Sequence, residues 1–142
     1  MRKLLILCIG ILITSMLQNV QAQKVKNLNT EEFKKTIWDY SNTKEWKYLG
    51  EKPAILDLYA TWCPPCKKLS PILEEIQKAY GDKLQIYKID VDKNPELAQL
   101  FNASSIPMMI FIPQKSKPFS VTGLRPQNQI EQIITEKLEI KK

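Results

Sequence analysis

The feature that most constrains this fold is a strand pattern that runs directly into Cys63-Pro64-Pro65-Cys66. Residues 54–60 are almost all apolar, which predicts a buried strand. Apolar residues then recur at helical spacing and predict a helix that ends near Tyr80, namely Leu69, Ile72, Leu73 and Ile76. Side chains three apart on a helix lie roughly 5–6 Å apart, and a disulfide needs about 3.8 Å between Cβ atoms. A small adjustment closes that gap, so we expect the two thiols to cycle between dithiol and disulfide without a change of fold.

Residues 1–22 have the pattern of a secretory signal peptide. Arg2 and Lys3 form a basic start, residues 4–17 are mostly apolar, and Val20-Gln21-Ala22 fits a cleavage site. The apolar stretch falls short of the about 20 residues that span a bilayer. We therefore expect a cleaved leader, an exported (periplasmic) protein and a mature domain of residues 23–142, with an uncleaved membrane anchor as the alternative.

Charge and cysteine content narrow the classes of partner. Removal of Arg2 and Lys3 leaves 19 basic against 15 acidic residues, a net charge of +4 that is scattered and not gathered into a stripe, so we expect no nucleic-acid partner. The leader also carries Cys8, so Cys63 and Cys66 are the two cysteines of the mature chain. A zinc site needs further ligands, and the chain has no histidine, so we expect no metal and no cofactor.

The remaining patterns predict an α/β domain. Short strands are expected at residues 24–28, 54–60, 84–91, 108–112 and 119–122, helices at 30–42, 65–80 and 94–102, and a final amphipathic helix lined by Ile130, Ile133, Ile134 and Leu138. Asn29 and Glu32 form a capping box that opens the first of these helices. The alternation of strands and helices, closed by two strands and a helix, predicts a central mixed sheet covered by helices on both faces.

The sequence resembles the thioredoxin family. The resemblance covers the chain from about Phe33 to Leu138 and implies the thioredoxin fold and a thiol–disulfide oxidoreductase. The residues that carry it are Asp57, Trp62-Cys63-Pro64-Pro65-Cys66-Lys67, Pro71, Lys88, Asp90-Val91-Asp92, Asn94-Pro95, Ile106-Pro107 and Gly123. A lone Cys-x-x-Cys is a modest signal, whereas this whole set in one order is a strong one.

The resemblance implies that Cys63 is the nucleophile. A sulfur at a helix N-terminus also faces unpaired N–H groups and the positive end of the helix dipole, which favour the thiolate. Cys66, expected one turn further in and less exposed, would resolve the mixed disulfide. Pro64 stands where the family commonly has glycine and, with Pro65, removes N–H groups near the sulfur, leaving that of Cys66 as the nearest donor. Whether Pro64 raises or lowers the reduction potential of the Cys63–Cys66 pair stays open.

Asp57 lies within a strand expected to be buried. A buried carboxylate is costly unless it is paired or protonated, so either Asp57 reaches water at a strand end or its pKa is raised. The resemblance favours the second reading and implies that Asp57 exchanges a proton with Cys66. It also implies that Lys88 pairs electrostatically with this acid.

The resemblance implies a cis peptide bond between Ile106 and Pro107. That bond would turn the Ile106 backbone towards the cysteines, where it can pair with an extended substrate segment. Trp62 at the strand-to-helix corner is expected to be exposed. The substrate groove is expected to include Trp62, Pro64, Pro65, Val91, Ile106, Pro107, Thr122, Gly123 and Leu124.

We expect a monomeric protein-disulfide reductase that acts on disulfide-containing exported proteins. Oxidases and isomerases of this family commonly have histidine before the second cysteine, where this chain has Pro65. A reductase in an oxidising compartment needs electrons, and resemblance to exported thioredoxins implies a membrane-embedded thiol donor. The alternatives are a periplasmic disulfide oxidase or isomerase, and a binding or chaperone module whose thiols are incidental.

Overall fold

The fold is built on a five-stranded sheet with the strand order β1-β3-β2-β4-β5. A computed structural model describes residues 23–142, so the predicted signal peptide lies outside the described residues. The strands are β1 (Lys26–Asn27), β2 (Ala54–Tyr59), β3 (Gln85–Asp90), β4 (Met108–Ile112) and β5 (Phe119–Thr122). The central strand β2 pairs in parallel with β3 and antiparallel with β4, which confirms the predicted mixed sheet.

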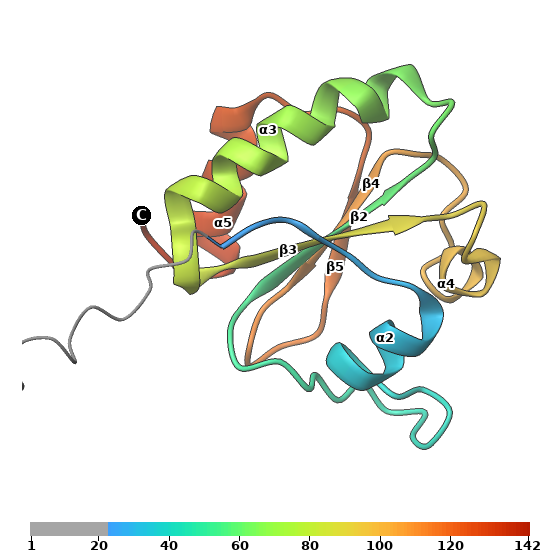
Figure 1. Ribbon diagram of the computed structural model, residues 1–142. Coiled ribbons are helices and arrows are strands. Elements are labelled where there is room, and N and C mark those ends of the chain that lie inside the picture. The colour runs from blue at the N-terminus through green and yellow to red at the C-terminus, as the bar shows by residue number, and fades with distance from the viewer. Residues whose placement is uncertain (1–22) are drawn as a thin grey trace, which may run out of the picture.

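Helices cover both faces of this sheet, as the sequence predicts (Figure 1). The helices α3 (Pro64–Tyr80) and α5 (Gln127–Lys137) lie on one face, and α2 (Thr30–Thr36) and α4 (Pro95–Leu100) lie on the other. A 3₁₀ turn, η1 (Gly81–Lys83), connects α3 to β3. Among residues 23–142, no helix is both long and apolar enough to cross a membrane.

Alternation along β2 divides the core into two apolar layers. Ile55 packs with side chains of α3 and α5, whereas Leu56 and Leu58 pack with those of α2 and α4. Asp57 and Tyr59 share the face of Ile55, because side chains two apart on a strand point the same way. The acid therefore lies on the sheet face that α3 covers.

The first helix is shorter than the sequence predicts. The capping box is present, with the Asn29 Oδ1 and the Glu32 carboxylate each accepting a backbone N–H at 2.9 Å, but α2 ends at Thr36 and not at residue 42. Beyond it, the Asp39 carboxylate accepts hydrogen bonds from the Ser41 N–H and from the Asn42 amide. These local bonds favour turns over a continued helix. Residues 37–53 therefore form an irregular connection to β2.

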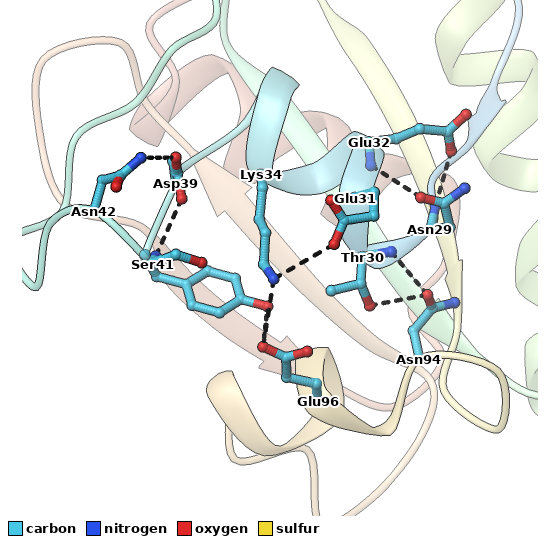
Figure 2. Close-up of polar contacts among 11 residues, drawn as sticks. Asn29, Thr30, Glu31, Glu32, Lys34, Asp39, Ser41, Asn42, Asn94 and Glu96 are labelled. Atoms are coloured by element: carbon cyan, nitrogen blue, oxygen red, sulfur yellow. Dashed lines mark hydrogen bonds and ion pairs between the residues drawn. The ribbon is translucent and has the colours of Figure 1, made fainter.

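Polar contacts join α2 to α4 on the outer side of one layer (Figure 2). Asn94 Oδ1 accepts hydrogen bonds from the N–H and the hydroxyl of Thr30, at 2.9 and 3.1 Å. Glu96 accepts a bond of 2.6 Å from the Tyr40 hydroxyl and lies 3.8 Å from the Lys34 ammonium. Residues from two distant parts of the sequence are fixed to each other in this way.

Several other boundaries differ from prediction by one or two residues: β2 ends before residue 60, β3 covers Gln85–Asp90 and not 84–91, and α4 covers Pro95–Leu100 and not 94–102. β1 covers Lys26–Asn27 and not the whole of residues 24–28, and α3 begins at Pro64 and not at Pro65. Proline suits the first helical position, because the N–H that it lacks has no partner within the helix there. The start of α3 is therefore set by the residue that directly follows Cys63.

Candidate active site at the start of helix α3

Cys63 and Cys66 form a disulfide at the N-terminus of α3, with their Cα atoms 5.3 Å apart. Cys63 is the N-cap residue of the helix, in an extended conformation, and its Sγ accepts the N–H of Cys66 at 3.3 Å. The arrangement agrees with the expectation that the Cys66 N–H is the donor nearest to the sulfur. The positive end of a helix of 17 residues thus lies at Cys63.

Both sulfur-bearing residues are buried in this disulfide state. Cys63 is 3% exposed and Cys66 is 2% exposed, so the expected contrast between them is slight. The two prolines between them are exposed. Cys63 and Cys66 pack with Ala60, and the partly buried Tyr59, Val91 and Ile106 lie against this cluster. The pair is therefore covered by apolar groups, beside an exposed proline surface.

Asp57 lies in the middle of β2, between Lys88 of β3 and Met109 of β4. Its side chain is 0% exposed, and within residues 23–142 neither carboxyl oxygen has a hydrogen-bond partner. Burial raises the pKa of Asp57 to about 6, and the opposing effect of the Lys88 charge is smaller. Of the two readings of this acid, the structure therefore supports the buried carboxyl with a raised pKa.

Lys88 lies beside Asp57 on the neighbouring strand, and its charge lowers the pKa of that acid, but the two side chains form no close ion pair in the described residues. In the part of the chain that the structure describes, no ion pair within 4.0 Å joins the two. The Lys88 ammonium instead donates to Ser70 Oγ at 2.7 Å and lies 4.4 Å from the centre of the Tyr59 ring. A lysine stem is long enough to reach past its register partner, so neighbours along the strand and on α3 decide where its charge lies.

Trp62 is 65% exposed at the corner before α3, as expected. Its indole N–H donates to Asp92 Oδ2 at 2.7 Å, which fixes the ring against the loop that follows β3. Asp92 is among the residues that carry the family resemblance, but its hydrogen bond to Trp62 was not predicted from the sequence. An acid two residues after the β3 strand was the available signal.

The Ile106–Pro107 peptide bond is cis, as the resemblance implies. Ile106 lies against the cysteine cluster, and Pro107 C=O accepts the N–H of Gly123 at 2.7 Å. Gly123 has a φ of +88°, which a side chain would strain, and the neighbouring Leu124 is exposed. The structure thus brings Ile106, Pro107 and Gly123 together, with Ile106 on the disulfide.

Several residues of this site were not found from the sequence. Ser70 and Tyr59 contact the Lys88 ammonium, yet neither was singled out. Tyr59 lies two residues after Asp57 on the same strand face, and Ser70 lies one helical turn after Cys66. Helix and strand periodicity therefore held a usable signal, although only the packing of α3 on the sheet shows that both meet Lys88.

The arrangement can carry out thiol–disulfide exchange. A sulfur at a helix N-terminus is favoured as thiolate, which is the attacking form. The second sulfur is bonded to the first, and an acid with a raised pKa lies on the sheet face that α3 covers. The exposed indole of Trp62 and the backbone at the cis Ile106–Pro107 bond, beside the cysteine cluster, offer a place for a substrate chain.

Comparison with known proteins agrees with this chemistry. The thioredoxin family model matches residues 24–136. The thioredoxin of Borreliella burgdorferi is 41% identical over 108 residues, covering 76% of this chain and 92% of that protein. The thioredoxin of Alicyclobacillus acidocaldarius is 36% identical over 90 residues, covering 63% and 86%.

Solved structures with the same fold include a chloroplastic thioredoxin z, with a TM-score of 0.68 and 27% identity over 80% of this chain and 93% of that one. The thioredoxin of Malassezia sympodialis has a TM-score of 0.65 and 27% identity, covering 84% and 96%. The chain therefore belongs to the thioredoxin family and is a thioredoxin-type thiol–disulfide oxidoreductase.

Proposed function

We propose that this protein reduces disulfide bonds of exported proteins. The observation that carries the proposal is the Cys63–Cys66 disulfide at the start of α3, with the buried Asp57 on the sheet face below. The leader pattern of residues 1–22 supports export, and Pro65 in place of histidine removes one means of stabilising the reduced thiolate. These features favour a reductase over an oxidase.

The reaction begins from the dithiol form of the protein. The Cys63 thiolate attacks one sulfur of the substrate disulfide, forms a mixed disulfide and expels the other substrate sulfur as a thiolate. The Cys66 thiol then loses its proton and attacks Cys63 Sγ. That step forms the Cys63–Cys66 disulfide and releases the second substrate sulfur. Two electrons pass to the substrate, and its two thiolates take up protons from the site and from water.

Asp57 acts as the proton acceptor for Cys66 in the second step. A carboxyl with a pKa of about 6 is ionised for most molecules near neutral pH, yet it holds a proton more firmly than an exposed aspartate. The carboxyl oxygens have no protein partner within residues 23–142, so their lone pairs are free for a proton or a water molecule. Lys88 contributes a positive charge at longer range.

The substrate chain docks beside the disulfide, on the predicted groove that includes Trp62, Ile106 and Gly123. Its backbone pairs with the Ile106 backbone, and its side chains contact the exposed Trp62 and Leu124. Pro64 and Pro65, which stand between the two cysteines in the chain, are also exposed and available for contact. A small and partly apolar surface of this kind suits brief contact with many substrates. In this proposal the protein acts as a monomer.

Electrons return to the Cys63–Cys66 disulfide from a membrane-embedded thiol donor. A periplasm is kept oxidising, so a reductase there needs a supply of electrons from the cytoplasm. Fractionation of cells together with N-terminal sequencing tests the location. We expect a periplasmic protein that begins at Gln23, and a cytoplasmic protein that begins at Met1 would contradict the proposal.

Insulin-disulfide reduction with dithiothreitol as the electron source tests the activity. We expect Cys63→Ser to lower the rate to that of dithiothreitol alone, because the attacking sulfur is lost. Cys66→Ser is the matched variant, and we expect it to accumulate a mixed disulfide that mass spectrometry detects. A wild-type rate equal to the dithiothreitol background would contradict the reductase activity and favour the alternative of a binding or chaperone module.

The direction of the reaction is tested by equilibrating the pair with glutathione. A potential near that of cytosolic thioredoxin, about −270 mV, is expected for a reductase. A value near about −120 mV would instead identify an oxidase.

A further inference from the structure

The Lys88 ammonium is held by two side chains that lie outside the Cys-Pro-Pro-Cys motif. Ser70 Oγ accepts its proton at 2.7 Å, from the turn of α3 that follows Cys66. The face of the Tyr59 ring lies 4.4 Å away, which is within the range of a cation–π contact. One neighbour comes from the helix and the other from β2, so the position of the charge is fixed from two directions.

Asp57 is the acid that this charge would otherwise approach. Asp57 and Lys88 are register partners on the parallel strands β2 and β3, and both point to the face covered by α3. Despite this register, no ion pair within 4.0 Å joins them in the described part of the chain. Over residues 23–142, both oxygens of Asp57 also lack a hydrogen-bond partner. A flexible cation beside a buried carboxyl without a partner would ordinarily close on it.

We propose that Ser70 and Tyr59 are positioning residues that hold the Lys88 ammonium apart from Asp57. The inference rests on the proposed role of Asp57 as proton acceptor and adds the groups that keep it available for that role. A direct ion pair would hold the carboxyl in its ionised form and occupy the oxygens that must take the Cys66 proton. The separation lets Asp57 gain and lose a proton close to neutral pH.

Other groups near Asp57 do not replace Lys88 in this function. β4 contributes Met109 opposite Asp57, which does not titrate. β3 contributes Asp90, whose carboxylate lies 3.9 Å from Lys93. From β2, Tyr59 has its pKa raised by burial and by Asp90 and Asp57, so the phenol stays neutral across the range in which Asp57 titrates. From α3, Cys63 and Cys66 are joined in a disulfide and carry no titrating proton.

The experiment is an NMR titration of the Asp57 carboxyl carbon in the disulfide form of the full mature protein, where neither cysteine titrates. We expect Ser70→Ala to lower the pKa of Asp57 by about one pH unit or more, because the released ammonium pairs with the carboxylate. Alanine suits a helix interior, so the variant is expected to fold. Ser70→Thr keeps the hydroxyl, and we expect it to restore the parent value.

Two further variants separate positioning from packing. Tyr59→Leu removes the ring face and is expected to lower the pKa of Asp57, whereas Tyr59→Phe keeps the face and is expected to leave it within a few tenths of a unit. Lys88→Met removes the charge and is expected to raise the pKa, since the lysine lowers it from a distance. The pKa of Asp57 is thus expected to fall when the lysine is released and to rise when the lysine is removed. The direction of the shift therefore distinguishes an effect of the position of Lys88 from an effect of its presence.

An unchanged or higher pKa of Asp57 in Ser70→Ala would overturn the proposal. Tyr59→Leu is an independent second test if Ser70→Ala does not fold. The titration requires no substrate and no turnover, so its outcome does not depend on the insulin assay. An active protein with an unmoved pKa contradicts only this inference, and an inactive protein with the expected shift contradicts only the proposed function.

Discussion

Asp57 places a carboxyl group where water does not reach. Its pKa of about 6, against an ordinary value of 3.8, means that the folded state binds the proton more tightly than the unfolded state between these two pH values. The unfolding free energy therefore falls as pH rises through this window, and the loss is complete above about pH 6. Ionisation of Asp57 costs the folded protein roughly 3 kcal/mol at neutral pH, from about 1.4 kcal/mol per pKa unit.

Replacing Asp57 by asparagine should therefore stabilise the protein in a pH-dependent way. We expect Asp57→Asn to raise the unfolding free energy at pH 7 by roughly 2–3 kcal/mol, because no buried charge then forms. At pH 3.5 we expect little difference, since the native carboxyl is protonated there. Urea unfolding at both pH values measures this, with the exposed Asp82→Asn as a control. An equal effect of Asp57→Asn at both pH values would show that the carboxyl does not titrate as described.

The elements give these residues their positions. α3 begins where two prolines follow the N-cap, so the Cys66 N–H is the first that can donate to the Cys63 sulfur. β2 is flanked by other strands and covered by helices on both faces, and this excludes water from its middle. The active-site chemistry thus depends on the end of one helix and the centre of one strand.

The contact between α2 and α4 depends on Asn94, which is 7% exposed. Its Oδ1 accepts two bonds from Thr30, and its Nδ2 donates to Asp90 C=O at 3.0 Å (Figure 2 shows the Thr30 bonds). We expect Asn94→Ala to lower the unfolding free energy by about 2–3 kcal/mol, since buried partners are left without bonds. Thermal and urea unfolding measure the loss. The exposed Asn128→Ala is the control, and a comparably small change in both variants would argue against this role of Asn94.

At the scale of the whole molecule, the sheet separates two apolar layers that share its strands. Ile37 is fully buried in the layer of α2 and α4, and Ile134 is fully buried in the layer of α3 and α5. Since β2, β3 and β4 each contribute side chains to both layers, we expect both layers to unfold in one cooperative transition.

Conservative truncation on the two faces tests this cooperativity. We expect Ile37→Val and Ile134→Val each to cost about 1 kcal/mol, and the double variant to cost the sum within about 0.5 kcal/mol. Urea unfolding followed by both fluorescence and far-UV circular dichroism should give coincident curves. Separate transitions for the two probes, or one variant that shifts only part of the signal, would show that the layers unfold independently.

The order of the helices and strands in this protein is determined largely by the local pattern of apolar and polar residues. Apolar runs and helical spacing predict the order of the elements, because each pattern reports which side of a segment is buried. Cys63 and Cys66 and the acid at position 57 are also recognisable from the sequence, since a polar group inside a strand pattern needs an explanation. The predicted end of α2 was wrong. The side-chain hydrogen bonds of Asp39 stabilise a turn in place of the helix, and apolar periodicity does not report such bonds.

Only the tertiary structure decides how the charges of the site are arranged. Packing of α3 on β2 and β3 brings Ser70 and Tyr59 to Lys88, and it leaves Asp57 without a close partner within residues 23–142. The loop after β3 likewise brings Asp92 to Trp62. Sequence patterns specify which face of an element is buried, whereas electrostatic contacts depend on distances of a few ångströms between segments far apart in the chain, and these arise only when the layers pack.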